Sequence, residues 1–160
     1  MKKLWMVLLA LLVIGIETVA AQVWTTSSPL PYQLKLPRNQ YSPGFQGVVA
    51  GSWVFKGNQI KAGETYELEI TFKSNRDFQG LDIIIVDGSE KANWWAELSD
   101  WAKIEEPIPA NTEITKKFTF TTTKGATSKE NRANQIVFDS QGATREVTLT
   151  FSKFSVTRVQ

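Results

Sequence analysis

Three of the six tryptophans of this 160-residue chain lie within one run, NWWAELSDW, which begins at Asn93. The chain contains neither histidine nor cysteine. Without them there is no imidazole base, no thiolate nucleophile and no soft metal site. What remains is aromatic surface, amides, hydroxyls and carboxylates, which suit holding a ligand better than transforming one. We therefore expect a binding protein and not an enzyme.

Side-chain alternation divides the tryptophan cluster into two faces if its backbone is extended. The apolar face, expected to join the core, contains Trp94, Ala96 and Leu98, and the other face contains Asn93, Trp95, Glu97, Ser99 and Trp101. Indole rings stack on the C–H faces of sugar rings, and neighbouring polar groups then bind the hydroxyls. Exposed tryptophans on one face therefore suggest a ligand. The candidate ligand-binding residues are Asn93, Trp94, Trp95, Glu97 and Trp101, together with Tyr41.

A helical interpretation of the same run stays open. Trp94, Leu98 and Trp101 also fit an i, i+4, i+7 stripe, with Asn93 as the N-cap. In that case two tryptophans fill the core and only Trp95 is exposed. The two interpretations differ in which indole rings a ligand can reach.

The acidic residues are the remaining candidates for chemistry. Two suitably spaced carboxylates hydrolyse glycosides, and the available groups are Asp82, Asp87, Glu97, Asp100, Glu105 and Glu106. Nothing in the sequence pairs them, so we expect no catalytic site. We expect no cofactor either. A structural calcium ion is the one candidate, around Asp77, Asp87 or Asp139, although no loop there has the carboxylate density of a strong calcium site.

The first 21 residues have the pattern of a secretory signal peptide. Lys2 and Lys3 precede an apolar stretch, and Val19-Ala20-Ala21 forms a small-residue cleavage site. The apolar stretch is too short to span a bilayer, and no second one follows. We therefore expect a secreted or periplasmic protein without a membrane span. The formal net charge of only +2 argues against a nucleic-acid partner.

The rest of the chain is predicted to be strands that follow an irregular segment. Residues 22–46 contain four prolines, which exclude a long regular element there. From residue 47 to 160 we expect one domain, beginning with the strand GVVAGSWVF. The run ETYELEITFK places Tyr66, Leu68, Ile70 and Phe72 on one face. In LDIIIVD both faces are apolar, which is typical of a central strand.

Two further strands and a closing one complete the pattern. TEITKKFTFTTT is expected to point Phe118 and Phe120 inward, and NQIVFDS is expected to be the next strand. In the closing run, REVTLTFSKFSVTRV, the apolar positions change parity after Phe151. A β-bulge near Ser152-Lys153 would return the later ones to the core. Strands of this kind, without convincing helices, predict an all-β fold of two packed antiparallel sheets.

The order of these segments resembles one family. IKAGETYELEITFKS, the apolar LDIIIVD, the Trp-bearing NWWAELS, EITKKFTFTTT and the closing VTLTFSKFSVTRV are together similar to the CenC-type carbohydrate-binding modules. The resemblance covers about residues 47–159. It implies a jelly-roll sandwich of the galactose-binding-like superfamily, binding of β-glucan or a related polysaccharide, and a stacking role for Trp95 and Trp94. The closing strand departs from the family pattern, because it lacks the acid that often helps to hold a structural calcium.

A second function class stays open beside carbohydrate binding. Carbohydrate-binding modules of the CenC type are normally attached to a catalytic domain, and we expect none in this chain. Certain bacterial envelope proteins resemble the same sandwich without binding polysaccharide. The alternative is therefore a structural or protein-interaction module of an envelope or extracellular assembly, because fold alone does not fix function. It predicts that the clustered indoles are buried or form an apolar patch against another subunit.

Overall fold

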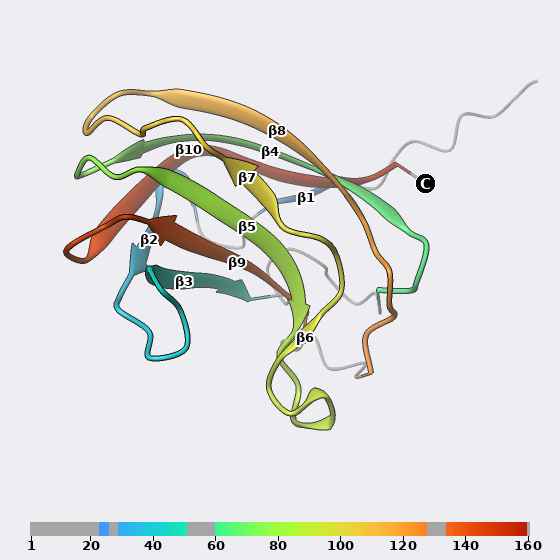
Figure 1. The fold of residues 1–160 in the computed structure, drawn as a ribbon. Coiled ribbons are helices and arrows are strands. Elements are labelled where there is room, and N and C mark those ends of the chain that lie inside the picture. The colour runs from blue at the N-terminus through green and yellow to red at the C-terminus, as the bar shows by residue number, and fades with distance from the viewer. Residues whose placement is uncertain (1–22, 26–28, 51–59, 128–133, 160) are drawn as a thin grey trace, which may run out of the picture.

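The computed structural model describes residues 23–25, 29–50, 60–127 and 134–159 as two antiparallel β-sheets packed face to face (Figure 1). Sheet A contains β1 (Val23–Thr25), β2 (Tyr32–Leu36), β4 (Thr65–Ser74), β8 (Ile114–Thr121) and β10 (Val147–Arg158). Sheet B contains β3 (Phe45–Ala50), β5 (Gly80–Asp87), β6 (Ala96–Glu97), β7 (Ala102–Ile104) and β9 (Asn134–Gln141). A 3-10 turn, η1 (Glu90–Ala92), follows β5. The prediction of an all-β, two-sheet jelly-roll sandwich is confirmed.

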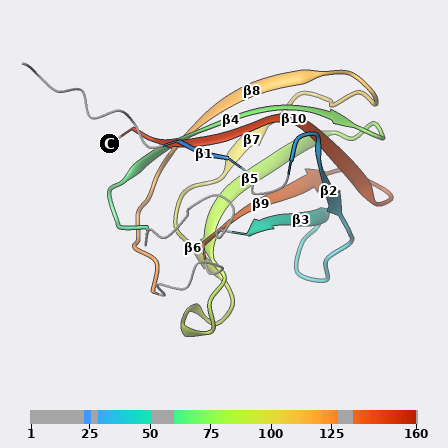
Figure 2. The same cartoon turned by 180° about the vertical axis from the view of Figure 1, so that it is seen from behind.

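Each sheet is organised around one long central strand. In sheet A, β10 pairs with β4 along one side and, along its other side, with β2 and then β1 (Figure 2). In sheet B, β5 pairs with β9 over its whole length, and β6 and β7 share its opposite edge. The central position predicted for the LDIIIVD strand is therefore confirmed. The predicted tryptophan cluster, which begins at Asn93, follows the end of this strand at Asp87.

The apolar faces of the strands meet as the sequence pattern predicts. Tyr66, Leu68, Ile70 and Phe72 of β4 are all buried in the core between the sheets. The register of β10 against β4 shifts between Phe151 and Lys153, which confirms the predicted bulge. Because of this shift, the apolar positions of β10 on both sides of the bulge are buried: Val147, Leu149, Phe151, Phe154 and Val156.

The prediction of an irregular segment over residues 22–46 is wrong for Val23–Thr25, which form β1, and for Tyr32–Leu36, which form β2. Pro31 and Pro37 flank this strand instead of interrupting it, so its backbone still pairs with β10. The next strand begins at Phe45, two residues earlier than expected. It packs closely against β2, because a Cβ on Gly47 would lie 2.6 Å from the Lys35 carbonyl oxygen.

Two of the predictions fall on residues that the structure does not describe. The predicted signal peptide, 1–21, lies outside the described residues, and so does the expected continuation of the β3 strand to Phe55. Among the residues that are described, no helix has the length and apolar character needed to cross a membrane.

Candidate ligand-binding site

The outer faces of the two sheets differ in their chemistry. On sheet A, the side chains facing away from the core form cross-strand ion pairs, with Lys117 Nζ 2.7 Å from Glu67 Oε1 and Lys153 Nζ 2.6 Å from Glu69 Oε1. Exposed pairs of this kind contribute little to stability and mark an ordinary hydrated surface. The outer face of sheet B is different, because it carries aliphatic and aromatic side chains.

Cross-strand register places three rows of side chains on the outer face of sheet B, since directly opposite residues share a face. The rows are Gln46, Asp139, Asp82 and Lys103; then Val48, Val137 and Ile84; then Gln135, Val86 and Glu97. Ile84, Val86 and Val137 are fully buried, and Trp101 packs against them. The Trp101 indole Nε1 donates a hydrogen bond to Glu97 Oε1 at 3.2 Å. Two predicted site residues therefore meet at one edge of this face.

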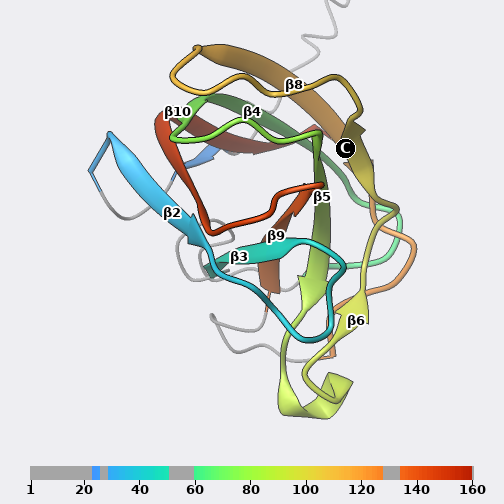
Figure 3. The ribbon, with the colours of Figure 1, turned by 60° about the vertical axis from the view of Figure 1, so that its left-hand side comes forward.

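Trp94 and Trp95 lie in the connection between β5 and β6, which projects beyond the end of β5 (Figure 3). Their exposed fractions are 68% and 41%, which is high for indole rings. This connection is nevertheless ordered by its own backbone. The Trp94 N–H donates to the Ser89 carbonyl at 2.9 Å, and the Trp95 N–H donates to the Ala92 carbonyl at 3.1 Å. The two rings are thus presented to solvent from a fixed turn, which we call the tryptophan loop (residues 88–95).

The backbone of the tryptophan loop is locally strained. Asn93 and Trp94 have φ angles of 51° and 65°, in the left-handed region. Asparagine adopts this region readily, but for a bulky residue it costs about 1–2 kcal/mol. Such strain persists where the surrounding structure imposes it, and it is concentrated at functional sites. Trp94 is therefore held in an unfavourable conformation while most of its side chain is exposed.

Asp87 anchors the start of the tryptophan loop. Its Oδ1 accepts a hydrogen bond from the Ser89 N–H at 2.9 Å, and its Oδ2 accepts from the Thr127 N–H at 2.6 Å and the Thr127 hydroxyl at 2.7 Å. Burial alone would raise the pKa of this carboxyl, but the bonds from Ser89 and Thr127 outweigh burial and lower the pKa. Asp87 is thus a buried, ionised anchor.

Neither sequence interpretation of the tryptophan cluster is correct throughout. The extended interpretation placed Trp94 in the core and Ser99 on the surface, whereas Trp94 is exposed and Ser99 is buried. The helical interpretation made Asn93 an N-cap, whereas it is the C-cap of the short turn η1. The pair of left-handed residues reverses the chain before β6, which accounts for the exposure of Trp94. Ser99 lies beyond β6 and is held inside by β5, because its hydroxyl accepts a hydrogen bond from the Ile85 N–H at 3.2 Å. Ala96 and Glu97 are extended in β6, as the first interpretation expected, but Leu98 and Ser99 are both buried, so the alternation fails again after β6.

Tyr41 lies apart from the tryptophans, in the connection between β2 and β3, and is 86% exposed. This connection is fixed to the outer face of sheet B, because the Ser42 hydroxyl donates to Asp139 Oδ2 and the Asn39 amide donates to Gln46 Oε1. Asp139 lies opposite Asp82 near the start of β5, whereas Glu97 lies opposite Val86 near its end. These positions are separated by about 13 Å of strand. The structure therefore does not bring Tyr41 to the tryptophan loop.

The register also pairs two carboxyl groups that sequence reasoning did not connect. Asp82 and Asp139 face one another across β5 and β9. Burial raises the pKa of both groups, and the charge of Asp82 adds to the increase at Asp139. Lys103 Nζ, 3.9 Å from Asp82 Oδ2, opposes the increase at Asp82. No sequence signal identifies this pair, because the two residues are far apart in the chain.

The three aspartates considered for calcium do not converge. Asp77 Oδ1 accepts the Ala110 N–H at 2.7 Å, Asp87 is engaged with Ser89 and Thr127, and Asp139 accepts the Ser42 hydroxyl. Within the described ranges, no group of three or more acidic residues is arranged to hold a metal ion. Each carboxylate instead fixes a neighbouring segment of backbone or a loop side chain.

Comparisons with known proteins support the fold. No protein-family model matches the chain, and no curated protein sequence matches it. Among solved structures, it is similar to an arabinose-bound GH51 α-L-arabinofuranosidase, with a TM-score of 0.52 and 16% identity over 86% of this chain and 22% of that one. It is also similar to a CocE/NonD family hydrolase from Staphylococcus aureus, with a TM-score of 0.51 and 6% identity over 86% of this chain and 36% of that one.

A CBM4 protein is a further similar structure, with a TM-score of 0.48 and 13% identity over 86% of each chain. The two likenesses with TM-scores above 0.5 establish a shared fold and, at 16% and 6% identity, nothing finer. The chain spans only about a fifth of the arabinofuranosidase and about a third of the hydrolase, so each of these two likenesses is to one part of a larger protein. The CenC-type assignment stays a prediction.

Proposed function

We propose that this protein is an exported, non-catalytic carbohydrate-binding module that holds a polysaccharide of the β-glucan class at the tryptophan loop. The observation that carries the proposal is the exposure of Trp94 and Trp95 on an ordered turn. Two adjacent indole rings in water are unfavourable for a protein that has no use for them. Their backbone is nevertheless fixed by hydrogen bonds within the loop and by Asp87 beneath it.

The chemistry around the loop suits a neutral sugar chain. Flat indole rings cover the C–H faces of pyranose rings, which are the least hydrated part of a glucan. Asn93 and Glu97 flank the two tryptophans in the chain, and both are exposed. The Glu97 carboxylate is a hydrogen-bond acceptor and the Asn93 amide is a donor, and sugar hydroxyls require both. Trp101, held by its hydrogen bond to Glu97, extends the aromatic surface onto the outer face of sheet B.

Preorganisation is the second support for the proposal. A ligand that meets a fixed aromatic surface does not have to order it, so less of the interaction energy is lost on binding. The left-handed conformation of Trp94 adds a further indication, because a glycine at this position would relieve the steric strain. A tryptophan that lowers stability where glycine would be tolerated is best explained by a function of the ring itself.

The test separates that function from stability. The purified protein is titrated with soluble β-glucan, xylan and mannan, and intrinsic tryptophan fluorescence is recorded together with urea unfolding. Trp94→Gly should leave the free energy of unfolding unchanged or raise it by up to about 1 kcal/mol. The same variant and Trp95→Ala should each weaken β-glucan binding at least about tenfold, which corresponds to 1.4 kcal/mol.

Tyr41→Ala is the matched control, since Tyr41 is also an exposed aromatic residue and lies near the other end of β5. It should leave β-glucan binding within about twofold of the wild type. Saturable binding that survives both tryptophan substitutions would contradict the proposed site. If a folded protein gives no fluorescence change with any glycan, the exposed indoles serve a protein partner and the proposal is wrong.

A further inference from the structure

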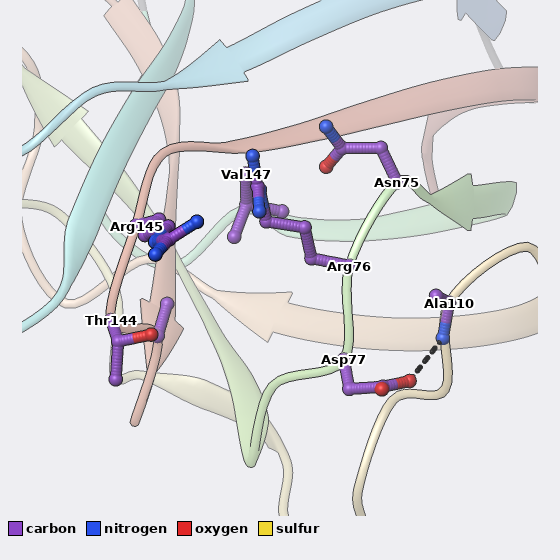
Figure 4. A pocket seen from close by; sticks show the side chains of 8 residues that line it. Asn75, Arg76, Asp77, Ala110, Thr144, Arg145 and Val147 are labelled. Carbon is purple, nitrogen blue, oxygen red and sulfur yellow. Dashed lines mark hydrogen bonds between the residues drawn. The ribbon is translucent and has the colours of Figure 1, made fainter.

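The opposite end of the sandwich carries a pocket of about 440 Å³ (Figure 4). It is formed where the β4–β5 and β9–β10 connections approach each other, with Ala110 of the β7–β8 connection at its side. The tryptophan loop follows the end of β5, whereas this pocket precedes its start. The eight residues of β5 separate the two by about 25 Å. The pocket is therefore distinct from the proposed glucan site, and its volume lies in the usual range for small-ligand sites.

Two arginines dominate the lining of this pocket. Arg76 comes from the β4–β5 connection and Arg145 from the β9–β10 connection, and their side chains reach toward one another (Figure 4). Neither guanidinium forms an ion pair with any residue that the structure describes, whereas Lys103, Lys116, Lys117, Lys153 and Arg158 all do. Asp77 is the one acidic residue of the lining, so two positive charges and one negative charge surround the pocket, and this balance favours an anion of a single negative charge.

The arginine-bearing segments are held in position by other contacts. Arg76 Nε donates to the Glu146 carbonyl at 3.0 Å, which leaves its two terminal nitrogens available. The Ser74 hydroxyl accepts the Arg76 N–H at 3.2 Å and donates to the Arg76 carbonyl at 2.7 Å. One guanidinium is therefore fixed before any ligand arrives, and that arrangement suits the planar, bidentate recognition of a carboxylate.

The other polar groups of the pocket suit hydroxyls. Asn75 uses its Oδ1 to accept the Thr148 N–H at 2.8 Å, so its Nδ2 stays a donor. Asp77 uses its Oδ1 to accept the Ala110 N–H at 2.7 Å, so its Oδ2 stays an acceptor. The Thr144 hydroxyl completes the set. A carboxylate in the lining opposes a sulfate or phosphate dianion, but it accepts hydrogen bonds from a hydroxylated ligand that carries a single negative charge.

We propose that this pocket binds a uronic acid residue of an acidic polysaccharide. The uronate carboxylate lies between the guanidinium groups of Arg76 and Arg145, and its ring hydroxyls reach Asn75, Asp77 and Thr144. A single sugar ring is small enough for the volume available. The protein then has two sites with different ligand chemistry, one for a neutral glucan and one for an acidic sugar, at the two ends of the same central strand.

The experiment is isothermal titration of the whole protein with trigalacturonate, with neutral galactotriose of the same ring stereochemistry, and with inorganic sulfate and phosphate. Trigalacturonate should bind saturably, and the neutral sugar should not. Arg145→Gln and Arg145→Lys should each weaken trigalacturonate binding at least about tenfold, since lysine keeps the charge but loses the bidentate geometry. The Arg145 side chain makes no hydrogen bond or ion pair with the residues that the structure describes, so its replacement breaks no such contact.

Lys124→Gln is the matched control, because it removes one positive charge from an exposed loop outside the pocket. It should leave trigalacturonate binding within about twofold. If Lys124→Gln weakens trigalacturonate binding as much as Arg145→Gln does, general charge attraction explains the binding and the proposal is overturned. If sulfate or phosphate binds as tightly as trigalacturonate, the pocket holds an adventitious ion only, and the proposal is overturned. Galactotriose binding of equal affinity would overturn it as well.

The same variants separate this proposal from the proposed glucan site. Arg145→Gln should leave the β-glucan fluorescence titration unchanged, and Trp94→Gly should leave trigalacturonate binding unchanged. Loss of uronate binding in Trp94→Gly would place both ligands at the tryptophan loop and overturn the second site. Failure of the glucan titration alone would leave the uronate result intact, because the two sites share no residue.

Discussion

Replacing Asp87 with asparagine tests whether this carboxylate anchors the tryptophan loop. The substitution preserves the shape of the side chain, so it creates no cavity and changes only the hydrogen bonding. Asp87 accepts three hydrogen bonds, one from Ser89 and two from Thr127. An asparagine has one acceptor oxygen and one amide nitrogen. Whichever way the amide turns, at least one of the donors of these two residues then faces an N–H group instead of an oxygen.

The size of the loss in the free energy of unfolding depends on which of these donors can form a hydrogen bond to water instead. Hydrogen bonds to a charged group contribute about 1.5–3 kcal/mol each. Thr127 is exposed, so its two donors can exchange the lost bonds for bonds to water, whereas Ser89 is buried and cannot. We therefore expect Asp87→Asn to lower the free energy of unfolding by about 2–3 kcal/mol at pH 7, close to one full charged bond plus part of another.

The assay is urea unfolding monitored by circular dichroism. With an m value of about 2 kcal/mol/M, the expected loss moves the midpoint down by about 1–1.5 M. Asp77→Asn is the matched control. Asp77 is exposed and accepts only one bond, from the Ala110 N–H, which an asparagine keeps by turning its oxygen toward it. This control should change the midpoint by less than about 0.3 M.

The pH dependence gives an independent check. The pKa of Asp87 is lowered in the folded protein, so its contribution is present above the ordinary aspartate pKa of about 3.9 and is lost as pH falls through the lowered value. The difference between wild type and Asp87→Asn should therefore narrow as the pH is lowered below 4. Equal midpoints for Asp87→Asn and Asp77→Asn, or a difference that widens in acid, would refute this account of the anchor.

Two further predictions concern the core and the outer face of sheet B. Phe151→Ala should lower the free energy of unfolding, measured by urea unfolding, by about 3–5 kcal/mol. Phe151 is fully buried, and the centroids of the Phe138 and Phe154 rings lie 5.5 and 5.4 Å from its own. Phe118→Ala, at the edge of the core, is the control, and an equally large loss there would contradict this prediction. Asp139→Asn should raise the melting temperature at pH 7 by a few degrees and leave it unchanged near pH 3. The raised pKa of Asp139 means that its protonated form stabilises the fold and that this stability is lost as pH rises through the raised value. A lower melting temperature at pH 7 would show that ionised Asp139 is required.

The strand pattern could be predicted from the sequence because it depends on local alternation. Every second residue of β4 from Tyr66 to Phe72 is apolar, and this spacing is typical of a half-buried antiparallel strand. The bulge in β10 was predictable for the same reason, since a change of parity after Phe151 leaves the later apolar residues exposed unless one extra residue is inserted. The strand β2 was not predictable in this way, because its flanking prolines carry the local signal of a loop and only pairing with β10 makes it regular.

The same distinction between local pattern and long-range pairing applies to the two candidate sites. The sequence by itself determined that tryptophan, amide and carboxylate groups are the available chemistry, and that Trp94 and Trp95 are adjacent. Only the tertiary structure decided that both rings are exposed, because two left-handed residues reverse the chain at that point and Asp87 anchors the loop to Thr127. It alone brought Arg76 and Arg145 to one pocket, since residues far apart in the chain meet only when two strand connections fold to the same end of a sandwich. Local spacing fixes which face a side chain takes, whereas long-range pairing fixes its neighbours.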